Sequence, residues 1–589
     1  MIATVGSSGT VRKGPGLPFI TRFRRRPAQG ATEPDERSPE EHSPEDAGDP
    51  SRARVVARWV TTTLACLLVL FALIAPNEIT RFTPEAFVRI PLEGLLGVAL
   101  VLILPSRARR VAAVVIGVML GLLAIVKIVD IGFSAVLARP FNLVFDWTLF
   151  GGADQFLTAS IGRAGAVGAG ILAVVLAVGV LVLMTLAVLR LTRLVVRHNT
   201  SATGAAAVLG VTWVTCAALG AQLVPGVPVA GVASGRLLQV RRSLEDRKEF
   251  AKEASVDAFG GIPSDRLLTG LRGKDVLLSF VESYGRDAIE DPRYASEVDA
   301  VLDAGSSRLR AAGFASRSGF LTSPTSGGGS WLAHSTLLSG LWVNNQQRYN
   351  SLVSSDRLTL SKAFEGAGWQ TAAVMPGTTT AWPESKFYGY ERVYDRWHIG
   401  YRGPRFNWGT PPDQFNLSAF QRLERAQPRH APVMAELPLV TSHAPWAPTP
   451  SGLVDWNTVG DGTVFGPMAA AGAKPEDVWR SPSRIRTAYR KSIEYSLNAL
   501  ISYVQTYGDD KLVLIFLGDH QPAPIITGQN ADRDVPITIV AKDPAVLDKI
   551  SSWGWQDGLK PGPHAPVWPM NAFRDRFLTA FGTLPHPTR

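Results

Sequence analysis

Cysteine is almost absent from this chain, which has two in 589 residues, Cys66 and Cys216. Both lie within apolar stretches, where a thiol behaves as a small hydrophobic group. The sequence therefore excludes a disulfide framework and a zinc site built from thiolates. So little cysteine is compatible with an extracytoplasmic domain of a bacterium that makes little use of disulfides.

Aliphatic runs are missing from residues 1–54, which are rich in Arg, Pro, Glu and Ser. This composition buries too little apolar surface to offset chain entropy, so we predict a disordered cytoplasmic tail. The net charge of +10 does not indicate nucleic-acid binding, because the arginines gather in this tail and in short loops beside apolar segments. A cleaved signal peptide is not expected, since the first apolar block starts well inside the chain and recurs.

Five apolar stretches of membrane-spanning length follow, at about 55–75, 86–104, 110–130, 164–189 and 203–225. Arginines precede the first stretch and follow the second and fourth, which places these three sites in the cytoplasm by the positive-inside rule. We therefore predict a five-helix transmembrane domain over 55–225 in a bacterial cell membrane, with the C-terminal part outside. The aromatic segment 131–163 is too polar to span and is predicted to form a lipid-facing rim.

A helical linker is predicted over 226–270, and an α/β domain with a mostly parallel central sheet over 271–589. Four short apolar runs are typical of buried parallel strands, at 276–281, 372–375, 433–435 and 512–517. Helical patterns cover 330–341 and 484–507. The Pro- and Trp-rich end of the chain, from Trp553 onward, is predicted to be a surface-packed tail.

Candidate metal ligands follow two of these predicted strands. Glu282 comes directly after strand 276–281, and Asp519 and His520 come after strand 512–517. Because ligands of α/β sheets bind at the carboxyl ends of strands, we expect the three side chains to meet at one edge. Carboxylate oxygen and imidazole nitrogen together suit Zn²⁺ or Mn²⁺.

A glycine-rich turn at 323–333 opens a predicted helix between these strands. The free amides at a helix start favour phosphate or sulfate, and Gly328 and Gly329 let an anion approach closely. Ser330 at the helix start is a candidate nucleophile, its hydroxyl activated by the neighbouring metal. Alternatively, Ser330 is only an N-cap, a position that serine favours.

His443 follows the strand that begins at 433 and adds a polar group at the same edge. It is predicted to contact a phosphoryl oxygen or to protonate a leaving alkoxide.

Together these residues resemble the extracytoplasmic domains of lipoteichoic acid synthases and related phosphoglycerol or phosphoethanolamine transferases, of the alkaline phosphatase and sulfatase superfamily. The resemblance covers about 270–545 and implies an alkaline phosphatase/sulfatase-like catalytic domain after a five-helix membrane anchor. It implies one divalent ion, Mn²⁺ or Zn²⁺, held by the side chains of Glu282, Ser330, Asp519 and His520. It also implies substrate contacts by Trp382, Asp413 and His443.

Two positions depart from the family pattern. The nucleophile is Ser330 where lipoteichoic acid synthases use Thr, a change that keeps the hydroxyl. Those synthases bind phosphoglycerol through a Trp followed two residues later by Arg, whereas Glu384 follows Trp382 here. An acidic group repels phosphate, so a different head group or acceptor is expected. Sulfatases are a poorer match, because the turn at 323–327 has neither their Cys nor their Arg.

The leading hypothesis is a transferase that moves a phospholipid head group, phosphoglycerol or similar, to a cell-envelope glycan or glycolipid through a phosphoryl-serine intermediate. A second hypothesis is a membrane-anchored phosphodiesterase or sulfatase that passes the group to water. A third is a non-catalytic envelope scaffold. Absence of tightly bound metal from the purified domain would favour the scaffold. Analysis of the reaction products separates the transferase from the hydrolase.

Overall fold

The computed structural model describes residues 50–583 apart from 79–80, 89, 220–228, 409 and 429–430. Two compact units divide the chain, Met1–Trp59 and Val60–Arg589. Residues 1–49 of the predicted tail lie outside the described part, and residues 50–54 are the first turn of a helix.

Long apolar helices form the N-terminal part of the described chain: α1 (Pro50–Ile74), α3 (Leu92–Ile103), α4 (Ser106–Leu137), α5 (Leu149–Arg197) and α6 (Asn199–Ala218), with a short α2 (Pro84–Phe87). Within the described residues, four segments are long and apolar enough to cross a membrane, at 52–74, 84–103, 106–137 and 161–197. The fifth predicted stretch falls on α6 and on residues 220–225, which lie outside the described part. A count of five crossings stays a prediction.

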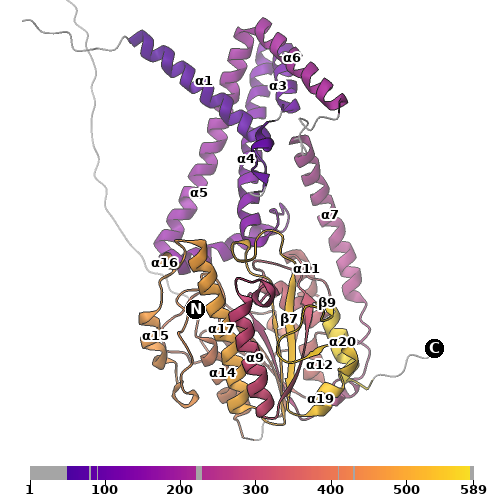
Figure 1. Cartoon of the computed structure of the whole chain (residues 1–589). Helices are drawn as coiled ribbons and strands as arrows, with labels where there is room; N and C mark the ends of the chain where they lie inside the picture. Colours follow the sequence, from indigo (N-terminus) through magenta and orange to yellow (C-terminus); the bar gives the residue numbers. More distant parts are fainter. Residues whose placement is uncertain are drawn as a thin grey trace, which may run out of the picture. The chain divides into compact units, whose positions relative to one another are not determined.

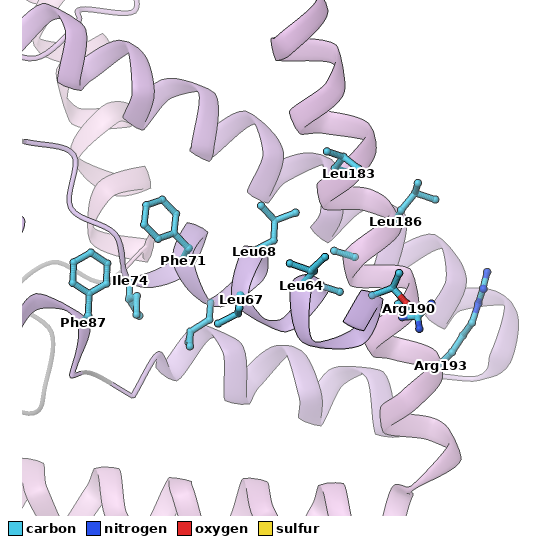
Figure 2. A pocket seen from close by; sticks show the side chains of 14 residues that line it. Leu64, Leu67, Leu68, Phe71, Ile74, Phe87, Leu183, Leu186, Arg190 and Arg193 are labelled. Atoms are coloured by element: carbon cyan, nitrogen blue, oxygen red, sulfur yellow. The ribbon is translucent and has the colours of Figure 1, made fainter. Parts of the chain in front are cut away.

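An apolar groove of about 1010 Å³ runs along α1 and α5, and Figure 2 shows leucine and phenylalanine side chains along it, with Arg190 and Arg193 at one end. Arg190 Nε donates to Thr62 Oγ1 at 3.0 Å and so ties the two helices together. Many apolar side chains of these helices are more than half exposed, among them Leu64 and Leu183. Such surfaces belong in contact with lipid.

Aromatic side chains of the segment 131–163 gather into one cluster. The Phe133 and Phe141 rings lie 4.9 Å apart, and Phe141 meets Trp147 at 5.3 Å. Trp147 and Phe150 remain 61% and 44% exposed. An exposed aromatic rim of this kind suits a membrane interface, which stays the prediction for this segment.

The C-terminal domain is built on a nine-stranded sheet. Its strands are β1 (Asp275–Val281), β2 (Ala315–Thr322), β3 (Gln370–Met375), β4 (Arg392–Asp395), β5 (Val433–Leu439), β6 (Leu512–Gly518), β7 (Asp534–Ala541), β8 (Gln556–Asp557) and β9 (Val567–Pro569). They are ordered β4-β3-β5-β1-β6-β7-β2-β8, with β9 also paired to β2. The run from β4 to β6 is parallel, and β7 is antiparallel to both of its neighbours. All four predicted strands and the mostly parallel sheet are confirmed.

Helices cover both faces of this sheet. One face packs against α9 (Ala295–Ala311), α14 (Asp413–Phe420) and α17 (Pro482–Tyr507), which Figure 1 shows side by side. The other face packs against α10 (Ser330–Ser339), α11 (Gln346–Val353), α12 (Leu360–Gly366), α19 (Pro544–Asp548) and α20 (Ala572–Phe581). Shorter helices complete the chain: α8 (Asp287–Glu290), α13 (Ser385–Tyr388), α15 (Gly466–Ala471), α16 (Pro475–Val478) and α18 (Pro524–Thr527). Two buried layers of side chains result, one on each side of the sheet.

Helix α17 begins with two residues that favour a helix start, Ser481 and Pro482. Pro482 occupies the first turn, where its missing N–H costs nothing, and the Ser481 side chain accepts a hydrogen bond from the Arg484 amide. Helix α7 (Val229–Ser255) lies within the predicted linker 226–270, whose bounds stay a prediction. It is followed by Asp257, which is bonded at both oxygens by Arg574 of α20, at 3.0 Å each.

The prediction of a surface-packed tail from Trp553 onward is wrong. Trp553, Trp555 and Trp568 are at most 9% exposed and belong to the core beneath β2. Strand β9 pairs with β2, and α20 covers the same face. Strands β8 and β9 have two and three residues, too few to show a strand period, whereas Phe573, Phe577 and Phe581 of α20 recur at the spacing of a helix.

Candidate active site

The carboxyl ends of β1 and β6 bring together the predicted metal ligands. The two strands are parallel neighbours, with Val281 opposite Gly518, so the residues that follow them meet at one edge of the sheet. Ligand atoms of Glu282, Asp519 and His520 all lie within 4.8 Å of one another, and all three side chains are buried. The three side chains thus meet at one edge of the sheet as expected, and their role as metal ligands stays a prediction.

The cluster has the atoms that a divalent cation requires. Asp519 Oδ1 accepts hydrogen bonds from the Ser283 and His520 amides at 2.7 Å each, whereas buried Oδ2 has no hydrogen-bond partner in the described part of the chain. His520 Nδ1 lies 2.8 Å from the Gln521 carbonyl, so Nδ1–H donates there and Nε2 is left for a ligand. One imidazole nitrogen and two carboxylates match the donor set of Zn²⁺ or Mn²⁺.

Two buried carboxylates this close compete for one proton. Burial and the adjacent charge of Glu282 raise the pKa of Asp519 well above its usual value. Burial opposes the charged form of Glu282 as well, but His520 and His443 outweigh it and lower the pKa of Glu282 to about 2. The protonated form is thus favoured more at Asp519 than at Glu282, and a bound divalent cation would favour the carboxylate form of both.

Ser330 lies directly at this cluster. Its Oγ donates to Glu282 Oε2 at 2.8 Å and is 3.2 Å from His520 Nε2. The alternative that Ser330 is an N-cap is wrong, because Gly329 occupies the cap position and Ser330 is the first residue inside α10. The Ser330 hydroxyl therefore does not cap the helix and contacts Glu282 and His520 instead.

The glycine turn fixes where Ser330 stands. Gly327, Gly328 and Gly329 have φ values of 74°, 151° and 81°, a region that favours glycine over residues with a side chain. Thr325 Oγ1 donates to the Gly328 carbonyl at 2.5 Å and closes the turn. Three consecutive residues of this kind lead the chain from β2 into α10 at the metal-ligand cluster.

No protein-family model matches the sequence, and no curated protein does. Solved structures do show similarity. The lipoteichoic acid synthase LtaP from Listeria monocytogenes is 14% identical, covering 58% of this chain and 78% of its own, with a TM-score of 0.35. The phosphoglycerol transferase GacH from Streptococcus pyogenes is 12% identical, with 57% and 91% covered and a TM-score of 0.34. The C-terminal periplasmic domain of EcEptC from Escherichia coli is 13% identical, with 52% and 82% covered and a TM-score of 0.35.

A cavity of about 430 Å³ opens beside Ser330 and is lined by most of the predicted substrate contacts, Gly328, Gly329, Trp382 and His443. The His443 ring is stacked on Trp408 at 4.3 Å with an angle of 8° between the planes. Its Nδ1 lies 2.5 Å from the Ala444 carbonyl, which fixes that nitrogen as the protonated one and leaves Nε2 for other chemistry.

Asp413 does not line this cavity. Its side chain is fully buried at the start of α14, where it accepts hydrogen bonds from the Thr441 amide at 3.0 Å and from Ser496 Oγ at 2.6 Å. The Asp413 amide in turn donates to Thr441 Oγ1 at 3.0 Å. Asp413 therefore holds the segment before His443 in place, which is a positioning role.

Burial raises the pKa of Asp413 to about 6, against the hydrogen bonds that lower it. The native state then holds a proton that the unfolded chain releases near its usual pKa of about 4. The free energy of unfolding is expected to fall as pH rises from about 4 to about 6. In Asp413→Asn this slope is expected to be absent when melting temperatures are measured across the range. The exposed Asp510→Asn serves as control, and equal slopes in all three proteins would contradict the assignment.

Gly518, directly before Asp519, lies where no side chain fits. A Cβ at this position would lie 1.8 Å from the Tyr284 carbonyl, so β6 passes very close to the chain that follows Glu282. Gly518→Ala is expected to push the two apart, lowering stability by roughly 1–3 kcal/mol and weakening metal binding. Thermal unfolding and a metal titration measure both effects. Gly466→Ala is the matched control, because nothing lies within 4 Å of its added Cβ.

The sequence reasoning missed a histidine and a glutamate that line the cavity, His334 and Glu436. His334 lies four residues after Ser330, one helical turn along α10. Glu436 lies inside β5, whose other residues are apolar. An acidic residue within an otherwise apolar strand could have marked Glu436 as a candidate site residue.

Proposed function

We propose that this chain is a membrane-anchored phosphotransferase that takes the head group of a phospholipid onto Ser330 and passes it to a cell-envelope glycan or glycolipid. The position of Ser330 Oγ, within 3.2 Å of both Glu282 and His520, carries this proposal. A hydroxyl held against metal ligands at the mouth of a cavity has the arrangement that nucleophilic catalysis requires.

Glu282, Ser330, Asp519 and His520 would hold one divalent ion, Mn²⁺ or Zn²⁺. When bound, such an ion lowers the pKa of a hydroxyl and offsets negative charge on phosphoryl oxygens. Asp519 Oδ2 has no hydrogen-bond partner in the described residues, and His520 Nε2 contacts Ser330 Oγ, the fourth proposed ligand, at 3.2 Å.

In the first half of the reaction, Ser330 Oγ forms a bond to phosphorus and the bond from phosphorus to the diacylglycerol oxygen breaks. The hydroxyl proton, which Ser330 Oγ directs at Glu282 Oε2 over 2.8 Å, passes on to water, because a carboxylate with a pKa of about 2 does not retain it. His443, as an imidazolium with a proton on each ring nitrogen, gives its Nε2 proton to the departing oxygen. In the second half, an acceptor hydroxyl attacks the phosphoryl-serine, its proton returns to His443 Nε2, and the Ser330 oxygen takes a proton back from water as its bond to phosphorus breaks.

The membrane helices support a lipid donor, because a domain tethered to a bilayer meets lipid head groups at high local concentration. Five crossings, as the arginine pattern predicts, would put the catalytic domain outside the cytoplasm. A hydrolase that passes the group to water would use the same first half.

The test is the intact mass of the full-length protein in detergent after incubation with Mn²⁺ and a total membrane lipid extract. An added mass on the wild type, absent from Ser330→Ala, is expected, and its size identifies the transferred group. Diacylglycerol release with a free phosphorylated head group and no transfer product would indicate a hydrolase. Metal binding without adduct, lipid turnover or phosphodiester hydrolysis would indicate a scaffold and overturn the proposal.

A further inference from the structure

The apolar groove along α1 and α5 has positive charge at one end. Figure 2 shows Arg190 and Arg193 at that end, with Phe71 and Phe87 toward the other. The described lining residues include these two arginines and no acidic residue. A basic site between membrane helices is typical of places where the head group of an anionic lipid binds. The groove thus combines an apolar length with a cationic end.

Helix α5 brings the two arginines together. Arg190 and Arg193 are three residues apart, a spacing that puts side chains next to each other on one face of a helix. Arg190 Nε donates to Thr62 Oγ1 of α1 at 3.0 Å, which fixes that guanidinium beside the groove. Arg193 is exposed and adds a second cation one turn further along α5. One phosphate group can therefore contact both guanidinium groups.

The length of the groove suits an acyl chain. Thr61 and Ile74 both line it, and α1 rises about 20 Å between them at about 1.5 Å per residue. The hydrocarbon of one leaflet is about 15 Å thick, half of a core of about 30 Å. An acyl chain that starts at the arginines therefore lies within the groove over its whole length.

The space in the groove is not filled by side chains of the described residues. Besides its hydrogen bond to α5, α1 is held near its C-terminal end by Lys127 Nζ, which donates to the Ala72 and Ala75 carbonyls at 2.9 and 2.7 Å. Between these contacts Leu67 of α1 and Leu183 of α5 are 57% and 59% exposed. Helices separated by an open gap lose packing contacts along it, so an apolar occupant would stabilise their arrangement.

We propose that this groove binds one phospholipid with a net negative head group. Its phosphate contacts Arg190 and Arg193, and an acyl chain lies along the leucines of α1 and α5. The arginine pattern predicts that this end of α5 is cytoplasmic, whereas Ser330 is predicted to lie outside. The bound lipid is therefore a structural lipid that joins α1 to α5, and it is not the donor attacked by Ser330. This inference goes beyond the proposed function and is independent of the chemistry at Ser330.

Native mass spectrometry of the full-length protein in detergent tests the proposal. The protein is titrated with dioleoyl phosphatidylserine, whose head group carries a net negative charge, or with dioleoyl phosphatidylcholine, whose head group carries none. EDTA is present so that no metal-dependent turnover consumes the lipid. One phosphatidylserine is expected to be retained at least about fivefold more tightly than phosphatidylcholine, the effect of one basic side chain near an anionic head group.

Arg193→Gln is expected to weaken phosphatidylserine binding by about fivefold and to leave phosphatidylcholine binding unchanged. Arg197→Gln is the matched control, because Arg197 is also exposed on α5 but does not line the groove, and its preference is expected to match the wild type. Leu186→Trp places a larger side chain in the groove and is expected to weaken binding of both lipids. Its control is Leu176→Trp, since Leu176 is equally exposed on α5 and lies outside the lining.

Equal retention of both lipids by the wild type would overturn the proposal, because it would show lipid that adheres without recognition of charge. Equal losses in Arg193→Gln and Arg197→Gln would place the anionic lipid elsewhere. A dimer of the lipid-free wild type that Leu186→Trp dissociates would show that a second copy of the chain occupies the groove. Failure of the proposed function at Ser330 would change none of these results.

Discussion

Replacing Ser330 by alanine is expected to lower turnover of any phosphodiester substrate by at least about 10⁴-fold, because the nucleophile is lost while its surroundings remain. Metal binding should persist, since Glu282, Asp519 and His520 are unchanged and lie within 4.8 Å of one another. Ser330→Thr keeps a hydroxyl and is expected to recover a measurable part of the activity. Initial rates at saturating Mn²⁺ measure the effect, and metal content is read on the same samples.

The matched control for Ser330 is Ser481, a serine at the start of another helix. Ser481 accepts from the Arg484 amide as an N-cap, so Ser481→Ala is expected to cost about 1 kcal/mol of stability and no activity. Ser330→Ala should show the reverse pattern, with activity lost and melting temperature preserved. Residual wild-type activity in Ser330→Ala would remove Ser330 from the mechanism.

Replacing Asp519 by asparagine is expected to weaken metal binding by at least about 10²-fold and to abolish activity. The metal-free protein should become no less stable, because burial and the charge of Glu282 raise the pKa of Asp519 and so make its charged form costly, a cost that a neutral amide avoids. Melting temperatures with and without EDTA separate the two effects. The wild type is expected to lose stability on chelation, whereas Asp519→Asn should melt at the same temperature in both conditions.

His398→Ala is a control for this experiment. His398 pairs with an aspartate, Asp395, at 2.6 Å, but its side chain is 71% exposed and it belongs to no metal-ligand group in the described residues. The EDTA shift should therefore match the wild type. A wild-type melting temperature that does not respond to EDTA would contradict the assigned metal site.

The meeting of Glu282, Asp519 and His520 was predictable from sequence because each comes directly after an apolar strand, and parallel strands end at the same edge. The position of Ser330 at the start of a helix was predictable from the glycines before it, which indicate a turn. Glu436 and His334 were not predictable in this way. A glutamate in a strand and a histidine in a helix have many ordinary positions, and only the packing of α10 on the sheet brings Glu436 Oε1 within 2.8 Å of His334 Nδ1.

Strands with uniform apolar runs, such as β1 and β6, were visible in the sequence, whereas β2 was not. Its residues Ala315–Thr322 include Ser316, Arg317 and Ser318, because β2 pairs with short strands and its first half is partly exposed. The core role of Trp555 was hidden for a similar reason. Gly319 on β2 leaves room for that indole, and such a fit depends on contacts between distant segments.

The order of the sheet has a consequence for how the domain is made. Every partner of β2 lies beyond residue 533, since β2 pairs with β7, β8 and β9. During synthesis, the edges of β2 therefore stay unpaired until almost the whole chain has been made. Unpaired strands invite association with other chains. A chaperone that shields the nascent domain, and an intact C-terminus, should decide the yield of folded protein more than the strength of its finished core.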